Sequence, residues 1–406
     1  MNVAHILNHL SDAYSGVSIG TQRMVNALSR LGIGISIWAT NDYEKEAGLL
    51  SEDITSYIYD TKWPIGWRRS PAFANALAAA STNIDIFHVH TVWSYPQYFA
   101  AKIAREKGIP YILAPRASLE PWRMNHRRFK KNVYLRLIGN TLIQNAVCLH
   151  AVATNEVDDF RKVGYKGPVF IAHNGITPEE FEHLPEPIAA ERKWPMLQGR
   201  RVVLYLSRLS PEKGIDEFIP AFSDIVKKSS YSDTFLVLAG PDDRGYRVTI
   251  EKMIQDAGIE AHVLLTGMVK GHDKLALMSR ADIYTLPSYS EGFSNSLLEN
   301  LAVGTPVLIT PGCNFPEVEK VGAGLCVEPR RDYLSEALKQ LLDMPKDKLS
   351  YMGNSGRRLV MKNYTWDIAA RKIATVYDAL LKKKEIPLHP EPISVDSQGK
   401  AVFDNS

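Results

Sequence analysis

Residues 283–302 read IYTLPSYSEGFSNSLLENLA, which joins a strand pattern to a helix pattern through one polar loop. The short apolar run Ile283–Leu286 has the length of a buried strand, and the apolar residues after the loop recur at helical spacing. Strand-to-helix steps of this kind recur along the chain, which is typical of parallel sheets covered by helices on both faces. The sequence therefore predicts an α/β fold of doubly wound sheets.

The strand-to-helix pattern occurs in two series, which predicts two Rossmann-like domains facing across a cleft. A chain of 406 residues also has the length of two domains rather than one. A Pro-rich, charged stretch follows His173-Asn174-Gly175 and separates the two series. We expect an N-terminal domain over 1–176, a linker over 177–198, a C-terminal domain over 199–365, a closing helix over 366–384 that packs back on the N-terminal domain, and a flexible tail over 385–406.

Composition excludes several classes of protein. With 45% hydrophobic and 23% charged residues the chain is expected to fold, and a net charge of +3 gives no global attraction to nucleic acid. Three cysteines without metal-ligand spacing indicate free thiols in a reducing compartment. There is no basic, apolar leader and no apolar run of about 18 residues. We expect a cytoplasmic protein that neither enters the secretory route nor spans a membrane.

Two segments of the second series carry residues suited to a nucleotide sugar. Arg208 and Lys213 follow a strand and open a helix, where two cations and free backbone N–H groups suit a diphosphate. Glu291 lies in the loop quoted above, and Glu299, two helical turns later, can accept two hydrogen bonds from a ribose diol. Taken alone, these four side chains are equally consistent with solvated charges and helix caps.

The wider pattern decides between these interpretations. The runs RLSPEKG (208–214), LTGMVKGHDKL (265–275) and ADIYTLPSYSEGFSNSLLENLAVGTPV (281–307) resemble the donor half of glycosyltransferase family 4. This family comprises retaining nucleotide-sugar transferases of the GT-B fold. The similarity extends to the first-strand loop, to HNGI at 173–176 and to the closing helix, so it covers nearly the whole chain.

The resemblance implies that the domain over 1–176 is the acceptor side and the domain over 199–365 binds the nucleotide-sugar donor. It also implies roles for individual residues. Arg208 and Lys213 would hold the donor diphosphate, Glu299 the ribose hydroxyls, and Glu291 the hydroxyls of the transferred sugar. The catalytic candidates are Glu291, Arg208, Lys213 and Arg116. The donor-binding candidates are Gly16, Arg208, Lys213, Met268, Glu291, Phe293, Ser294 and Glu299. No metal or other cofactor is expected, because cations and helix N-termini stabilise the leaving diphosphate, and a UDP-sugar is preferred over a GDP-sugar as donor.

The chain departs from the family pattern at Arg116. Many relatives have Pro-His-Gly where this sequence has Pro115-Arg116-Ala117, and an arginine cannot act as a general base at neutral pH. We expect Arg116 to place a sugar oxygen or an anionic group electrostatically. His88 and His90 share one face of a strand, but the nearby sequence offers no third metal ligand. His90 is therefore interpreted either as a polar residue of the acceptor side or as a structural histidine.

A basic amphipathic segment follows in the first domain. No Asp or Glu occurs between Pro121 and Asn155, and basic residues alternate there with aromatic and aliphatic ones. The residues assigned to an acceptor or membrane side are His90, Arg123, Arg127, Arg128, Lys130 and Lys131. Such a segment favours an anionic membrane surface or a pyrophosphate-bearing acceptor, while a solvated helix face is the alternative. The inner face of the cytoplasmic membrane is thus a second expected location.

The resemblance therefore implies a hexosyltransferase that retains anomeric configuration. Its acceptor would be a glycan or lipid-linked glycan in bacterial polysaccharide, O-antigen or lipopolysaccharide biosynthesis. Two alternatives remain open: a nucleotide-sugar epimerase of the same fold, and a non-catalytic nucleotide-sugar-binding protein. No nucleic-acid partner is expected, because no recognition motif accompanies the basic residues.

Overall fold

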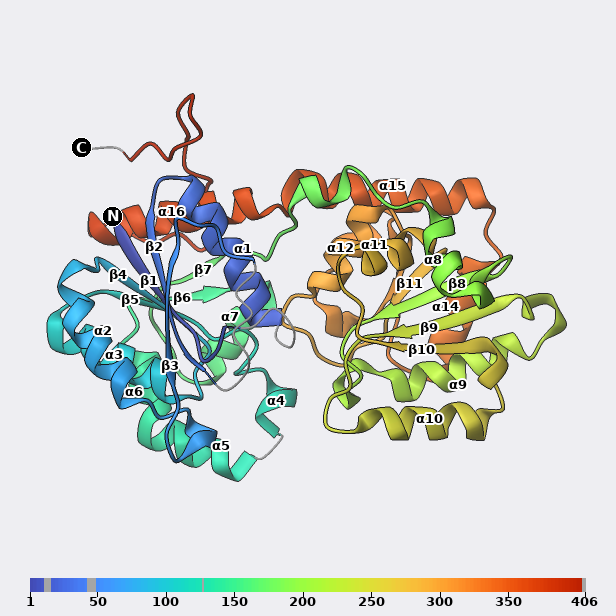
Figure 1. Ribbon diagram of the computed structural model, residues 1–406, viewed down its shortest axis with the longest axis horizontal. Helices are drawn as coiled ribbons and strands as arrows, with labels where there is room; N and C mark the ends of the chain where they lie inside the picture. The colour runs from blue at the N-terminus through green and yellow to red at the C-terminus, as the bar shows by residue number, and fades with distance from the viewer. Residues whose placement is uncertain (11–15, 42–48, 126–127, 404–406) are drawn as a thin grey trace. The chain divides into compact units, whose positions relative to one another are not determined.

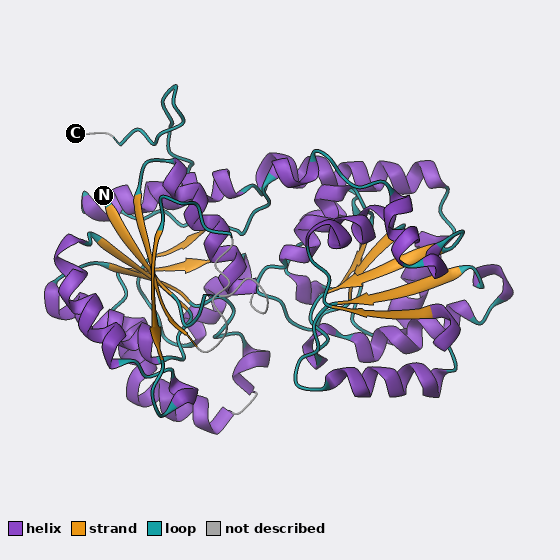
Figure 2. Ribbon diagram, in the orientation of Figure 1, coloured by secondary structure: helices purple, strands orange, loops and turns teal. Residues whose placement is uncertain are grey.

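The computed structural model describes residues 1–10, 16–41, 49–125 and 128–403. The chain forms two compact units, unit 1 (Met1–Gly175 with Trp366–Ser406) and unit 2 (Ile176–Thr365) (Figure 1). Each unit has a parallel sheet with helices on both faces (Figure 2). The predicted α/β fold with two doubly wound sheets is confirmed.

The sheet of unit 1 has the strand order β3-β2-β1-β4-β5-β6-β7, and every neighbouring pair is parallel. Its strands are β1 (Asn2–Ile6), β2 (Gly34–Asn41), β3 (Thr55–Asp60), β4 (Ile86–His90), β5 (Tyr111–Ala114), β6 (Cys148–Ala151) and β7 (Val169–Ile171). The sequence pattern missed β3. This edge strand leaves most of its residues exposed or half-exposed, so it lacks the apolar run of a buried strand.

Two groups of helices cover the faces of the unit 1 sheet. The helices of this unit are α1 (Gly16–Arg30), α2 (Pro71–Ala80), α3 (Tyr95–Lys107), α4 (Pro121–Asn125), α5 (Arg128–Tyr134), α6 (Asn140–Gln144), α7 (Thr154–Lys162) and α16 (Trp366–Leu381). Helices α1 and α16 share one core with residues of β1, β2, β4, β5, β6 and β7. Helices α2, α3, α6 and α7 share a second core with the opposite face.

The end of the chain belongs to unit 1. The expected closing helix is α16, which packs against α1. The expected flexible tail is instead attached to this unit over its described part: Ile171 N–H donates to Leu388 O at 2.8 Å, and Ala401 N–H donates to Leu31 O at 3.0 Å. Ile386, Ile393, Ala401 and Phe403 pack on the α1–α16 core. The residues that dock the tail are isolated apolar residues without periodic spacing. The hydrophobic pattern of the sequence therefore did not predict this contact.

Unit 2 has a sheet of order β10-β9-β8-β11-β12-β13, again parallel throughout. Its strands are β8 (Arg201–Leu206), β9 (Thr234–Ala239), β10 (Val263–Gly267), β11 (Ile283–Leu286), β12 (Val307–Ile309) and β13 (Gly324–Cys326). Its helices are α8 (Pro187–Lys193), α9 (Ile215–Val226), α10 (Tyr246–Ala257), α11 (Gly271–Arg280), α12 (Asn295–Val303), α13 (Glu317–Lys320), α14 (Arg331–Leu342) and α15 (Lys346–Asn363).

The predicted linker is a folded part of unit 2. Ile176 N–H donates to Tyr364 O at 2.8 Å, so unit 1 ends at Gly175 rather than at residue 176. Helix α8 packs against α11, and the largely buried Arg280 pairs with Glu191 at 2.6 Å. The Pro and charged residues of 177–198 thus form short helices rather than a free connection.

Candidate functional site

Two loops of unit 2 bring Lys213 and Glu291 together. Lys213 ends a short turn after β8, Glu291 lies in the loop after β11, and these strands are neighbours in the sheet. Lys213 Nζ lies 2.6 Å from Glu291 Oε1, with side-chain exposures of 6% and 8%. A buried ion pair of this kind needs further hydrogen bonds to offset its loss of hydration. Ser288 Oγ supplies one, donating to Glu291 Oε1 at 2.8 Å.

The backbone around Glu291 is fixed from a third loop, after β12. Glu291 N–H donates to Gly312 O at 2.8 Å, and Asn314 Nδ2 donates to Glu291 O at 2.6 Å. A Cβ on Gly312 would lie 2.3 Å from Ser288 O. A Cβ on Gly214, which has φ +68°, would lie 1.9 Å from Pro287 O. Both positions therefore require glycine, because any side chain would push these loops apart.

Arg208 lies beside this pair with its guanidinium held by two carboxylates. Its Nη1 donates to Asp243 Oδ2 at 2.8 Å and its Nη2 donates to Glu212 Oε1 at 2.9 Å. The Arg208 side chain is 37% exposed, whereas that of Lys213 is buried. A diphosphate could thus reach Arg208 from solvent, in exchange for a carboxylate partner.

Glu299 lies in α12, whose start is capped by Ser294. The Ser294 hydroxyl accepts from Leu297 N–H, which satisfies one of the free donors of the first turn. Glu299 Oε2 lies 2.7 Å from Lys274 Nζ of α11, and the carboxylate is only 7% exposed. The carboxylate predicted to accept from a ribose diol is therefore already oriented by an ammonium group.

Two further donor-site candidates have different settings. Phe293 is nearly buried and stacks on Tyr364 with ring centroids 5.8 Å apart, so its side chain fixes the loop. Met268 follows β10 and is 38% exposed. Both residues lie in loops after strands of the unit 2 sheet, at the edge where such folds bind nucleotides.

Sequence reasoning missed the partners of these side chains. Lys274, Asp243, Glu212, Ser288 and Asn314 each contact a predicted residue, but they are surface-type residues in loops and helix starts. Only the fold shows that Lys213 and Glu291, 78 positions apart, share a hydrogen bond.

In unit 1, Arg116 lies in the turn after β5 and is 8% exposed. Its backbone φ is +55°, and that of Ala117 is +58°, a left-handed conformation that non-glycine residues seldom adopt. The Glu156 carboxylate holds this turn by accepting from the N–H groups of Ala117 and Val152. Arg116 Nη1 donates to Asn174 Oδ1 at 3.0 Å. Burial lowers the pKa of Arg116 to about 10, so its guanidinium stays charged at neutral pH.

The structure corrects the assignment of His90 to an acceptor or membrane side. His90 is fully buried, and its Nδ1 lies 3.5 Å from Arg116 Nη2. Gly16 is the first residue of α1, and a Cβ built on it meets no described atom within 4 Å. Residues 15–18 were expected to form a loop that approaches a phosphate, but 16–18 are the start of α1, and Ser15 lies outside the described residues.

The third metal ligand that the sequence did not offer is His5. Ring nitrogens of His5, His88 and His90, all buried, lie within 4.8 Å of one another. A divalent cation fits this cluster poorly. It would have to displace the bond between His5 Nδ1 and His90 Nε2 (3.1 Å), and it would lie close to the Arg116 guanidinium. The chemistry of the cluster is therefore that of hydrogen-bonded histidines.

The basic segment forms α4, α5, a π-helical turn (Leu135–Gly139) and α6. Arg128 and Lys130 are exposed, while Arg123 lies 3.9 Å from Glu120 and Lys131 Nζ donates to Arg123 O. Arg127 lies outside the described residues. Phe129 is 82% and Leu137 72% exposed, so large apolar side chains stand in solvent beside the basic ones.

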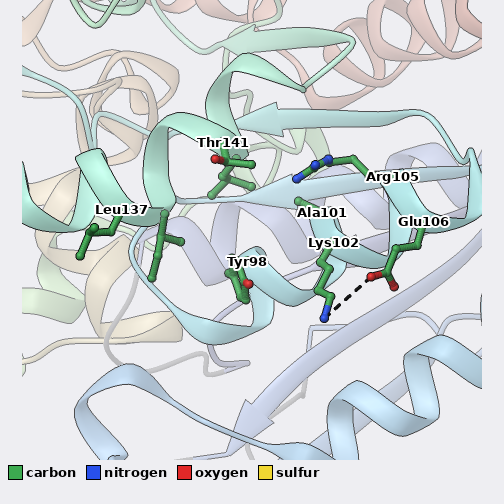
Figure 3. A pocket seen from close by; sticks show the side chains of 9 residues that line it. Tyr98, Ala101, Lys102, Arg105, Glu106, Leu137 and Thr141 are labelled. Atoms are coloured by element: carbon green, nitrogen blue, oxygen red, sulfur yellow. Dashed lines mark ion pairs between the residues drawn. The ribbon is translucent and has the colours of Figure 1, made fainter.

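A cavity of about 430 Å³ adjoins this segment, between α3 and the π-helical turn with α6 (Figure 3). Lys102 and Arg105 of α3 line one side, and Lys102 lies 3.8 Å from Glu106. Leu137, Ile138 and Thr141 line the other side. None of the residues predicted from the sequence lines this cavity.

Comparisons with known proteins agree with this geometry. Residues 15–175 match the family described as glycosyl transferase 4-like domain, and residues 189–359 match glycosyl transferases group 1. The chain belongs to the family 4 type of glycosyltransferases with the GT-B fold. The two matches coincide with the two series of strands, and the second one contains all the donor-site residues discussed above except Gly16.

Individual relatives match part of the chain. A GDP-mannose-dependent α-(1-6)-phosphatidylinositol monomannoside mannosyltransferase of Mycobacterium tuberculosis is 32% identical over 49% of this chain and 53% of its own length. An α-monoglucosyldiacylglycerol synthase of Streptococcus pneumoniae is 26% identical over 72% of this chain and 67% of its own. The chain spans about half the length of the first of these relatives.

Among solved structures, Anabaena HepE in complex with UDP and glucose superposes with a TM-score of 0.77 at 17% identity. The superposition covers 93% of this chain and all of that one. This likeness shows that both chains have the same fold.

Proposed function

We propose that this glycosyltransferase moves a hexose from a nucleotide sugar to a glycan or lipid-linked acceptor with retention of configuration. The observation that carries the proposal is the buried Lys213–Glu291 pair at the carboxyl ends of β8 and β11. Parallel α/β sheets bind their ligands at this edge, and Glu299 and Arg208 lie in segments that follow the same strands. Family membership supports the assignment of these residues to the donor.

The reaction needs placement and charge stabilisation more than proton transfer by the protein. Lys213 and Arg208 would stabilise the negative charge that grows on the leaving diphosphate, which itself assists removal of the acceptor proton. The Lys213 ammonium has three donors, and Glu291 takes one of them in the unliganded chain. Because these cations supply positive charge, we propose that transfer requires no divalent metal.

The proposal also concerns the nucleobase of the donor nucleotide. We propose a UDP-sugar as the donor, and the UDP bound in the HepE structure supports it. The name of the mycobacterial relative makes GDP-mannose the alternative. Both relatives named above act on lipid-borne acceptors by name, which supports a lipid-linked acceptor. We propose bacterial polysaccharide or lipopolysaccharide synthesis as the setting.

Thermal melting tests the donor assignment. A nucleotide at 100 times its dissociation constant is expected to stabilise the protein by about 2.7 kcal/mol, with or without chelator. Glu299→Ala is expected to abolish this shift, and Lys274→Met to weaken it, because Lys274 orients the Glu299 carboxylate. Lys252→Met on α10, which breaks an exposed pair with Asp256, is the matched control and should keep the full shift.

Each outcome of the melting experiment separates two hypotheses. A shift with GDP and none with UDP would replace the expected donor base, and a shift that chelator removes would contradict metal-free binding. Stabilisation without transfer to any lipid or glycan acceptor would favour a nucleotide-sugar-binding protein over an enzyme. Conversion of the nucleotide sugar itself, without acceptor, would favour an epimerase.

We also propose that the segment 121–144 contacts an anionic membrane surface. In the part of the chain that the structure describes, no helix is both long and apolar enough to cross a bilayer. The exposed Phe129 and Leu137 beside Arg128 and Lys130 provide apolar and cationic groups on one segment. The cavity lined by Lys102 and Arg105 adjoins it.

Vesicle flotation measures this contact. The protein is expected to float with vesicles that contain anionic lipid and to stay in solution with neutral ones. Replacing Arg128 and Lys130 by alanine is expected to weaken the partition about 30-fold, because each basic residue near such a surface contributes about 1 kcal/mol. Val248→Ser, a change at an exposed apolar residue of unit 2, should leave flotation unchanged. Equal flotation on neutral vesicles would contradict an electrostatic contact.

A further inference from the structure

A hydrogen-bonded chain of buried side chains crosses the α1–α16 face of the unit 1 sheet. Histidines from β1, β4 and β6 alternate along their strands with apolar residues that point to the opposite face of the sheet, which places the histidine rings in one layer. Tyr377 of α16 approaches this layer from the covering helix. The side chains of the chain, all of them buried, are Arg116, His90, His5, Tyr377, His88 and His150.

The direction of this chain is fixed at both of its ends. At one end His150 Nε2 lies 2.9 Å from Ala172 O, and a carbonyl can only accept. At the other end Arg116 Nη2 faces His90 Nδ1 at 3.5 Å, and a guanidinium can only donate. His150 must therefore carry its proton on Nε2, and His90 must offer a bare Nδ1.

The links from the carbonyl end then assign the next two groups. Neutral His150 has a bare Nδ1, which lies 3.2 Å from His88 Nε2, so His88 donates from Nε2. The bare Nδ1 of His88 lies 2.7 Å from the Tyr377 hydroxyl, which must donate to it. The neutral state that this argument uses follows from burial, which lowers the pKa of His88 and His150 well below the usual value.

The hydrogen bonds that start from Arg116 reach Tyr377 through His90 and His5. His90 has a bare Nδ1 and hence donates from Nε2 to His5 Nδ1, at 3.1 Å. His5 then donates from its own Nε2 to the oxygen of Tyr377, at 3.4 Å. One assignment satisfies every link: all four histidines are neutral with the proton on Nε2, and the Tyr377 hydroxyl both accepts and donates.

We propose that Tyr377 and His5, His88, His90 and His150 are positioning residues that hold the Arg116 guanidinium in one orientation. Arg116 needs such support, because its backbone and that of Ala117 are left-handed and its charge is buried. Its Nη1 donates to Asn174 Oδ1, but the other acceptor of Nη2 is the weak Met24 Sδ at 3.6 Å, so His90 Nδ1 supplies the nitrogen acceptor on that side of the guanidinium. The consequence for sugar transfer rests on the proposed function, in which Arg116 places a donor oxygen or an anionic group.

The assignment of protons is tested first, on the unmodified full chain. Nuclear magnetic resonance of protein labelled with ¹⁵N-histidine distinguishes the two neutral tautomers and the imidazolium. At pH 7 the four buried histidines are expected to be neutral Nε2–H tautomers. If any one of them were protonated on Nδ1 or charged, the proposed hydrogen-bond assignment would be wrong. This readout does not depend on whether the protein transfers sugar.

Tyr377→Phe then interrupts the chain at its middle. The change removes one oxygen, leaves His88 Nδ1 without a donor and leaves His5 Nε2–H without an acceptor. We expect the resonances of His5, His88 and His90 and the Arg116 guanidinium signal to shift. Turnover should fall about tenfold, the effect of one lost hydrogen bond, while the donor KM stays within twofold.

Tyr111→Phe is the matched control. Its hydroxyl is buried in the same sheet and donates to Leu142 O at 2.6 Å, outside the chain. It should leave the Arg116 signal and turnover unchanged. An Arg116 signal unmoved by Tyr377→Phe would overturn the positioning role. Absence of all transfer activity in the unmodified protein would instead refute the proposed function. The histidine and guanidinium signals would still test the hydrogen-bonded chain of side chains.

Discussion

Lys213→Met is expected to lower the rate of sugar transfer by about 30- to 1,000-fold, which corresponds to about 2–4 kcal/mol of transition-state stabilisation. The same change is expected to lower the free energy of unfolding by about 3–5 kcal/mol, because it leaves the buried Glu291 carboxylate without its cation. Ser288 would remain as a hydrogen-bond donor to Glu291, which limits the loss of stability but supplies no charge. Initial rates and urea unfolding measure the two effects.

A double variant separates the two effects. In Lys213→Met with Glu291→Gln neither side chain is charged, so most of the lost stability is expected to return. The rate should stay low, because neither the cation for the diphosphate nor the carboxylate for the sugar is restored. A double variant that regains activity together with stability would show that the pair serves only the fold. Arg331→Met, which breaks an exposed pair with Asp224, is the control for removal of a cation from unit 2.

The alternation of short apolar runs with amphipathic stretches was enough to predict both sheets, because strands buried on two faces are apolar throughout. The same rule explains the missed strand β3, whose Tyr57 is exposed and stacks on Trp38 only at the edge of the sheet. It also explains the tail, where single residues such as Ile393 dock into a core built by other segments. Long-range docking of this kind leaves no periodic signal in the sequence.

The sequence predicted individual residues of the candidate site but not the contacts between them. The resemblance selected Glu299, but its partner Lys274 comes from another helix and has no marked sequence context. The spacing of His88 and His90 predicted that both lie on one face, and their rings are stacked with centroids 4.6 Å apart. The contributions of His5 and Tyr377, which lie more than 80 and 280 positions away from these histidines, depend on strand order and helix docking. Charge pairing between distant segments therefore requires the structure.

Acidification is expected to destabilise unit 1 far more than unit 2. Burial lowers the pKa of His5 to about 3 and holds those of His88, His90 and His150 well below the usual value, with the Arg116 charge adding to the effect. In the unfolded chain the same histidines titrate near pH 6.5. Below that pH the unfolded state takes up protons that the folded state does not, so stability is complete at neutral pH and falls with pH. From pH 7 to pH 5 the loss is about 2 kcal/mol for His5, and the lowered pKa values of the other three histidines add to it in the same direction.

The other groups that face these histidines change this expectation little. Arg116 stays charged and Tyr377 neutral throughout this range, since burial lowers the pKa of Arg116 only to about 10 and raises that of Tyr377. Burial raises the pKa of Glu156, so this carboxyl takes up a proton in the folded state first and offsets part of the loss. Hydrogen exchange resolved by peptide, corrected for the intrinsic pH dependence of exchange, would report the two units separately. Unit 2, which lacks such a histidine cluster among its described residues, is the internal control, and equal losses in both units would show that the histidines are not neutral in the folded protein.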